Sequence, residues 1–87
     1  MKTFLAAGIF TAALLGPAQA GKEFGGYECT DGCVSHAAGY RWAESRHITK
    51  EAACRGRSNS FVEGCRVYVS DPNHNADEDD DGDPIGR

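Results

Sequence analysis

The sequence predicts an all-α fold: a small disulfide-stapled helical hairpin of two main helices and a short connecting helix, followed by a disordered acidic tail. Three observations predict it. Two stretches repeat apolar or small residues every three or four positions, which is typical of helices that bury one face. Four cysteines are available to staple a chain that is short for a core held by burial alone. Acidic residues are concentrated in residues 72–87.

Residues 1–20 have the three zones of a secretory signal peptide. Lys2 supplies the positive end, residues 4–15 form an uncharged apolar run, and Ala18, Gln19 and Ala20 present a small-x-small cleavage pattern. The apolar run is too short to cross a bilayer stably as a helix. We therefore expect cleavage after Ala20, no stable membrane anchor, and a secreted or periplasmic location for residues 21–87.

The module of residues 29–71 follows a glycine-rich stretch, residues 21–28, that we expect to be a flexible lead. Thr30 or Asp31 can cap the first helix. A stripe at helical spacing follows, which predicts about four turns with one buried face. Its members are Cys33, His36, Ala37, Tyr40, Ala43 and His47.

A short connecting helix is expected at residues 50–54, with Thr49 as its cap. Ser60 and Glu63 then match a capping box that would begin the second main helix. Proline at position 72 should stop this helix after Asp71. Its stripe of core positions is Phe61, Val62, Cys65, Tyr68 and Val69.

Export would place the four cysteines in an oxidising compartment, so two disulfides are expected. In an antiparallel helical hairpin, the cysteine nearest the start should face the one nearest the end. This predicts nested pairs, Cys29 with Cys65 and Cys33 with Cys54. The alternative is a zinc site, because Cys29, Cys33 and His36 form a cluster to which Cys54 or Cys65 could add.

Charge divides the chain into a neutral module and an acidic tail. Residues 21–71 carry seven basic and seven acidic side chains, whereas residues 72–87 carry six acidic side chains and one arginine. A binder of nucleic acid or of an anionic membrane needs a basic face. We therefore expect neither as a partner.

The tail has a pattern typical of calcium loops. Its D-x-D-x-D-G run predicts a weak calcium site with oxygen ligands from Asp77, Asp79, Asp81 and Asp83. The run resembles the ending of Excalibur-type extracellular calcium-binding segments, but Ile85 and Gly86 stand where that family has cysteine and glutamate. The preferred interpretation of the tail is a solvated, disordered extension that aids solubility and binds no cofactor, and the calcium site is the alternative.

No nucleophile lies beside a histidine once the cysteines are oxidised, so we expect no enzyme. A small hydrolase or metalloenzyme with His36 as general base, assisted by Asp31 or Glu44, is kept as an alternative. The first hypothesis is a module that binds an unknown protein or envelope component. Exposed arginine and tryptophan are common anchors of interfaces, and the candidates are Arg41, Trp42, Arg46, Arg55 and Arg57.

The module also resembles a group of short exported bacterial proteins of unknown function. The shared pattern is Y-x-C-T-x-x-C-x-x-H-x-A-G-Y-x-W-A, which begins at Tyr27, followed by S-F-x-E-G-C, which ends at Cys65. The resemblance implies a bacterial, exported, cysteine-stapled module. It implies no activity and no ligand residues, and it does not extend to the acidic tail.

Overall fold

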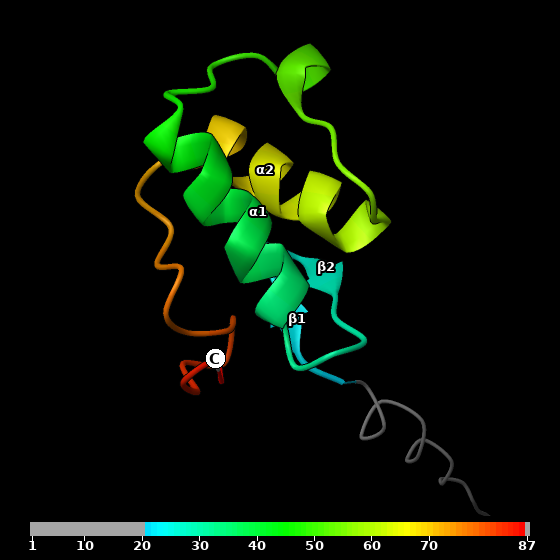
Figure 1. Ribbon diagram of the computed structural model, residues 1–87. Coiled ribbons are helices and arrows are strands. Elements are labelled where there is room, and N and C mark those ends of the chain that lie inside the picture. Colours follow the sequence, from blue (N-terminus) through cyan, green and yellow to red (C-terminus); the bar gives the residue numbers. More distant parts are fainter. Residues whose placement is uncertain (1–20, 87) are drawn as a thin grey trace, which may run out of the picture.

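The computed structural model describes residues 21–86, so the expected signal peptide lies outside the described residues. The chain is mostly helical, but it is not purely α-helical as expected, because it opens with a two-stranded sheet (Figure 1). The elements in chain order are β1 (Glu23–Phe24), β2 (Tyr27–Glu28), α1 (Val34–Ser45), the 3-10 helix η3 (Glu51–Ala53) and α2 (Asn59–Ser70).

The stretch expected to be a flexible lead is a tight antiparallel hairpin. Phe24 pairs with Tyr27, and the two residues between them are glycines at φ 59° and 87°. Positive φ at both central positions is what a two-residue hairpin turn requires, and glycine adopts it without strain. Strands of two residues are too short to give a periodic sequence signal, which is why the hairpin was not predicted.

The first disulfide sets the start of α1. Cys29 and Cys33 are bonded, with their Cα atoms 4.9 Å apart. Residues four apart on a helix hold their Cβ atoms about 5–6 Å apart, which exceeds the spacing that a disulfide needs. The chain therefore turns through Cys33 at φ 73° and becomes helical only at Val34. The expected cap Asp31 still serves the helix, since its carboxylate accepts the Ser35 N–H at 3.2 Å.

The predicted stripe of α1 is confirmed over most of its length. His36, Ala37, Tyr40 and Ala43 are buried, whereas His47 is exposed beyond the end of the helix. The helix closes with two backbone bonds, from His47 N–H to the Glu44 carbonyl and from Ile48 N–H to the Ala43 carbonyl. These bonds, with His47 at φ 55°, form a Schellman motif, and glycine is the usual residue at the position that His47 occupies.

Helix α2 begins two residues earlier than the capping box predicted. Ser58 is the N-cap, and its hydroxyl accepts the Phe61 N–H at 3.1 Å. Glu63 does not complete a capping box, because its carboxylate contacts His36 instead. The end at Ser70, just before Asp71 and Pro72, agrees with the prediction.

The two main helices cross with their backbones in close contact, and two glycines permit it (Figure 1). A Cβ atom added at Gly39 would lie 1.9 Å from the Phe61 carbonyl oxygen, and one added at Gly64 would lie 1.9 Å from the His36 carbonyl oxygen. Each glycine therefore receives the main chain of the opposite helix.

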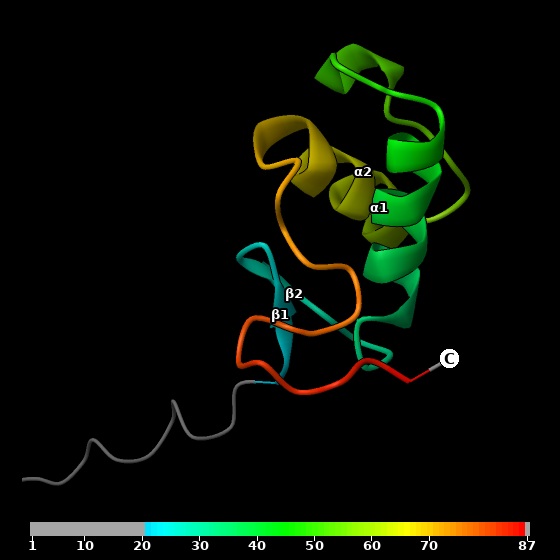
Figure 2. The same ribbon diagram turned by 90° about the vertical axis from the view of Figure 1, so that its left-hand side faces the viewer.

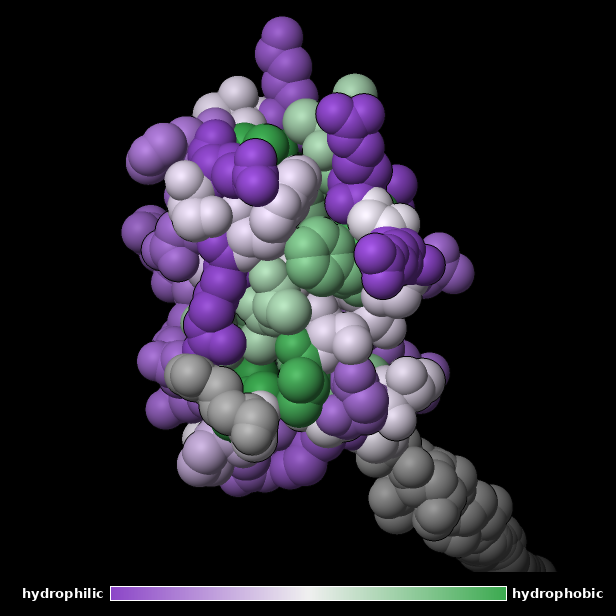
Figure 3. All heavy atoms as spheres, viewed as in Figure 1, coloured by the Kyte–Doolittle hydropathy of each residue, from purple (hydrophilic) through white to green (hydrophobic). Residues whose placement is uncertain are grey.

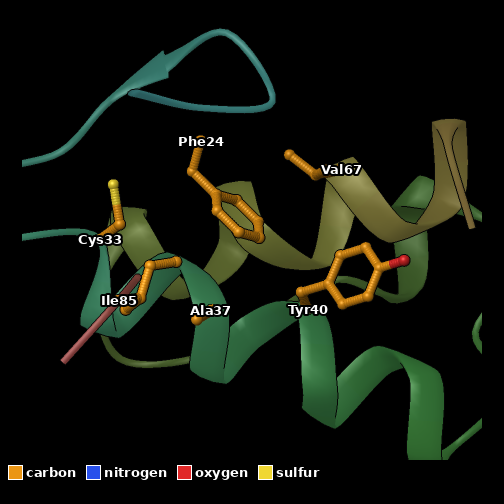
Figure 4. Close-up of a cluster of buried hydrophobic side chains, with 6 residues drawn as sticks. All are labelled: Phe24, Cys33, Ala37, Tyr40, Val67 and Ile85. Carbon is orange, nitrogen blue, oxygen red and sulfur yellow. The ribbon is translucent and has the colours of Figure 1, made fainter. Parts of the chain in front are cut away.

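The main core lies between the hairpin, both helices and the tail. The Phe24 ring points from the hairpin toward the helices, where Ala37, Tyr40 and Val67 surround it (Figure 4). Ile85, near the end of the chain, belongs to the same cluster and is 7% exposed. A second, smaller cluster joins α1, η3 and α2 through Ala43, Cys54 and Cys65.

The acidic tail is ordered, which corrects the expectation of disorder. It returns along the hairpin (Figure 2). The Asp80 N–H donates to the Glu23 carbonyl at 2.8 Å, and the Asp80 carboxylate accepts the N–H groups of Gly25 and Gly26 at 2.7 and 2.8 Å. The tail therefore closes the hairpin turn and delivers Ile85 to the core.

The disulfide pairing also differs from the prediction. Two bridges are present, but they join Cys29 to Cys33 and Cys54 to Cys65, so the nested pairs Cys29–Cys65 and Cys33–Cys54 were wrong. The nested scheme assumed two antiparallel helices that lie side by side along their whole length. The helices cross instead, and the unpredicted hairpin holds Cys29 next to its sequence neighbour Cys33. Both bridges indicate an oxidising extracellular environment.

Among residues 21–86, no helix has the length and apolar character that crossing a membrane requires.

Candidate functional site: an aromatic cleft with arginines around it

A cleft of about 370 Å³ opens between the end of α1, the start of α2 and the segment that precedes α2. Trp42 of α1 and Phe61 of α2 form its floor, with ring centroids 5.7 Å apart and ring planes inclined at 56°. Both side chains are only partly buried. The remaining lining residues are Arg55, Gly56, Arg57 and Ser58.

The second disulfide and a helix cap hold the cleft in shape. The Cys54–Cys65 bridge ties the start of the segment 55–58 to the middle of α2. The Ser58 cap fixes the other end of that segment on the first turn of α2. Between these points Gly56 lies against the Phe61 ring, where an added Cβ would come within 2.6 Å of a ring carbon. The floor and the wall of the cleft are thus built by local features of the sequence.

Arginine side chains surround the aromatic floor. The Arg46 guanidinium lies over the Trp42 ring, 5.3 Å from its centroid, in a cation–π arrangement. Arg55 and Arg57 are exposed. Within residues 21–86, none of these three guanidinium groups has a carboxylate partner within 4.0 Å. In Figure 3, which shows the face seen in Figure 1, hydrophobic side chains form an exposed band between hydrophilic ones.

Three of the five residues predicted for interaction line this cleft, namely Trp42, Arg55 and Arg57, and a fourth, Arg46, lies over the Trp42 ring. Arg41 does not. It faces the tail, where it pairs with the Asp77 carboxylate and donates to the Ala76 carbonyl. The sequence reasoning assigned Phe61 to the core and overlooked Gly56 and Ser58. In the sequence, a glycine and a capping serine stand next to two arginines in residues 55–58, and this pattern could have identified the segment.

The acidic turn collects three of the four predicted calcium ligands. Oxygen atoms of Asp79, Asp81 and Asp83 lie within 4.8 Å of one another. Asp77 does not belong to this group, because it pairs with Arg41. The Lys22 ammonium contacts both Asp79, at 3.3 Å, and Asp83. A cation from the chain itself therefore already neutralises part of the cluster.

Asp79 is the buried member of this turn. Its Oδ1 accepts the N–H groups of Asp81 and Asp83 at 2.9 and 3.0 Å. Burial pushes the pKa of Asp79 up, but these two donors and the Lys22 ammonium outweigh it and hold the pKa below its usual value. Conversely, the hydrogen bond to Asp83 raises the pKa of Lys22. The turn is built around charged carboxylates and one ammonium group.

His36 lies in the helix interface and is fully buried. Its Nε2 is 2.7 Å from Glu63 Oε1, and its Nδ1 has no hydrogen-bond partner among the described residues. Neither Asp31 nor Glu44, the partners considered for a general base, forms a hydrogen bond with the ring. The zinc alternative is excluded, because all four cysteines are in disulfides and no thiolate is left for a metal.

Three comparisons with known proteins were made. No family model matches the chain, and neither the search of curated proteins nor the search of solved structures found a match. Any functional conclusion therefore rests on the geometry of the chain.

Proposed function

We propose that this chain is an exported, non-enzymatic binding module that recognises another protein through the cleft lined by Trp42 and Phe61. The observation that carries the proposal is one open aromatic cleft that α1, the segment 55–58 and α2 form together, with Arg55 and Arg57 in its lining and Arg46 over the Trp42 ring. Tryptophan and arginine are the residue types most enriched among interface residues that dominate binding energy. The two disulfides fit a secreted or periplasmic module that must hold such a surface without a large core.

Site-specific photo-crosslinking tests this proposal. A benzoyl-phenylalanine is placed at position 57 in the full-length chain, which is expressed in the organism that carries the gene. The matched control carries it at position 66, an exposed arginine of α2 outside the cleft. We expect a protein adduct of discrete mass from position 57 that position 66 does not give. Equal adducts from both positions, adducts to envelope glycan or lipid alone, or no adduct would contradict the proposal.

A second candidate function is weak calcium binding by the acidic turn. The carboxylates of Asp79, Asp81 and Asp83 favour it, since calcium takes oxygen ligands and extracellular sites bind it at about 10⁻⁴–10⁻³ M. The Lys22 ammonium opposes it, because calcium would have to displace this cation.

A calcium titration followed by the amide shifts of residues 77–85 tests the second candidate. Lys22→Ala should bind calcium more tightly than the parent chain, because the competing ammonium is gone. Asp77→Asn is the control and should leave the affinity unchanged, because Asp77 lies apart from the three clustered carboxylates. If millimolar calcium shifts no amide in either the parent or Lys22→Ala, the turn is not a calcium site.

A further inference from the structure

The cleft wall offers main-chain hydrogen-bonding groups as well as side chains. Within residues 21–86, no hydrogen bond involves the backbone of Arg55, Gly56 or Arg57. The stretch is sharply bounded, because the Cys54 N–H donates to the Glu51 carbonyl and the Ser58 carbonyl accepts the Val62 N–H. Both bounding residues have extended backbone, at φ −76°, ψ 116° and φ −124°, ψ 152°. Three consecutive residues thus have amide and carbonyl groups that an extended chain could pair with.

The charge around this wall is positive and locally uncompensated. Arg46, Arg55 and Arg57 have no carboxylate partner among the described residues, although acidic residues outnumber basic ones in the chain and give it a net charge of −4. The acidic side chains with lysine or arginine partners among the described residues, Asp77, Asp79 and Asp83, are in the tail and bind Arg41 and Lys22 there. Guanidinium groups pair preferentially with planar carboxylates through two parallel hydrogen bonds.

The aromatic floor of the cleft favours a ligand that carries an apolar group. The Trp42 and Phe61 rings contact each other and are inclined at 56°, so they form an angled apolar floor and not one flat platform. A volume of about 370 Å³ is at the low end of the roughly 300–1,000 Å³ of small-molecule pockets. The cleft therefore has room for one or two side chains packed against this floor.

We propose that the cleft binds an extended peptide segment in which acidic residues flank one aromatic or aliphatic side chain. The apolar side chain packs on the Trp42 and Phe61 rings, the flanking carboxylates pair with Arg55 and Arg57, and the peptide backbone bonds to residues 55–57. This inference rests on the proposed function and names the chemistry of the partner at the same cleft. The net negative charge of the chain favours a peptide over an anionic bilayer, because the acidic tail would be repelled from such a surface.

The affinity should be modest and sensitive to salt. Six residues line the cleft, fewer than the roughly 20–30 residues a side of a standard interface, so a dissociation constant in the micromolar range is expected. The paired charges are at the rim, where salt screens them.

The chain carries its own reporter for the experiment. Trp42 is the single tryptophan, so its fluorescence reports directly on the cleft. Residues 21–87 with both disulfides intact are used to select binders from a displayed library of random heptapeptides. The selected peptides are then synthesised with blocked ends and titrated while the Trp42 emission is followed.

We expect the selection to enrich peptides with two or more acidic residues around one aromatic or aliphatic residue, and these should shift the Trp42 emission saturably. Charge reversal by Arg55→Glu together with Arg57→Glu should weaken binding at least tenfold. Arg66→Glu is the matched control, being an exposed arginine outside the cleft, and should change the affinity less than twofold. Far-UV circular dichroism confirms that each variant is folded.

The other outcomes overturn the inference in distinguishable ways. If neutral or basic peptides are enriched, or if binding survives the double charge reversal, the ligand chemistry is wrong although the cleft can still be an interaction site. If no selected peptide moves the Trp42 emission while crosslinking at position 57 captures a protein, the linear-peptide inference fails and the proposed function stands. If vesicles of phosphatidylglycerol shift the emission and no peptide does, the surface recognises membrane rather than protein.

Discussion

The two glycines at the helix crossing give the sharpest test of how the fold is held. Gly64→Ala would place a Cβ atom 1.9 Å from the carbonyl oxygen of His36 and 2.7 Å from its carbonyl carbon. Ordinary contacts of a Cβ atom begin at 3.4 Å, so the helices must separate by the difference, about 1.5 Å. The obstacle is helix backbone on both sides, so no single side chain can rotate away to relieve it.

The energetic consequence follows from this separation. A gap of 0.5–1 Å already forfeits about a quarter to a half of the dispersion attraction between facing atoms. Overpacking of a core typically costs about 1–3 kcal/mol of stability. We expect a cost at the upper end of this range, because the added Cβ atom would clash with backbone atoms. Alanine also gains about 1 kcal/mol over glycine in a helix interior. The net expectation is a destabilisation of about 2 kcal/mol, or a fall in Tm of about 8–16 °C for a domain of this size.

Urea and thermal unfolding followed by far-UV circular dichroism, with both disulfides intact, measure this effect. Ala38→Gly on the exposed face of α1 is the control, because it reports helix propensity alone and should cost about 1 kcal/mol. If propensity governed position 64 as well, Gly64→Ala would stabilise the chain. A variant as stable as the parent, or more stable, would refute the reasoning from backbone contact.

Three further predictions concern the disulfides, a helix end and the tail. Removing Cys54–Cys65 by double alanine substitution should destabilise the fold by about 3 kcal/mol, and removing Cys29–Cys33 in the same way by about 2 kcal/mol, because the closed loops span 11 and 4 positions. Urea unfolding of the two variants measures both losses. A larger loss for Cys29–Cys33 would contradict the dependence on loop length. His47→Gly should raise stability by up to about 1 kcal/mol, since glycine adopts the φ of 55° without strain, and a fall in Tm would show that the exposed imidazole makes a contact that matters. Burial pushes the pKa of Asp80 up, but the N–H groups of Gly26 and Gly25 and the nearby His74 outweigh burial and hold this pKa below its usual value. The Asp80 carboxylate therefore stabilises the fold above about pH 4, and this stabilisation is lost as the pH falls through the lowered pKa. Asp80→Asn should therefore have a lower Tm than the parent at pH 7, with the gap closing toward pH 2, and a gap independent of pH would contradict the linkage.

The sequence predicted both main helices but the buried face of only one, because in the predicted stripe of α2 only Cys65 is buried, and the buried Val67 lies outside that stripe. The spacing of His36, Ala37, Tyr40 and Ala43 predicts the buried face of α1, and the structure confirms it. The disulfide count was also predicted correctly, since an even number of cysteines in a short chain favours full pairing.

The connectivity and the tail could not be predicted, because both depend on contacts that leave little trace in local sequence. The hairpin consists of two strands of two residues, and only its Gly-Gly turn marks it. The tail is ordered by hydrogen bonds from that turn to Asp80 and by burial of one apolar residue, Ile85. An acidic segment with so few apolar residues is ordinarily disordered, and here tertiary contacts override that tendency.

The candidate cleft could also be predicted only in part. The residue types at the cleft, tryptophan and arginine, were predicted from the sequence. The location of the cleft required the fold, since Arg41 and Trp42 are adjacent in sequence yet lie at different sites. Phe61 illustrates why a core assignment from periodicity is incomplete. It belongs to the stripe of α2 and its backbone lies at the crossing against Gly39, but its side chain is only partly buried and lines the cleft beside Trp42.

The helix crossing and the cleft are therefore parts of one arrangement. Gly39 admits the carbonyl group of Phe61, and this close approach brings the Phe61 ring beside Trp42, three positions further along α1. Gly64 admits the carbonyl group of His36, nearer the start of α1. Gly39→Ala should consequently change the Trp42 emission of the folded protein more than Gly64→Ala does, even where the two variants lose similar stability, because only the first displaces the residue that faces the tryptophan.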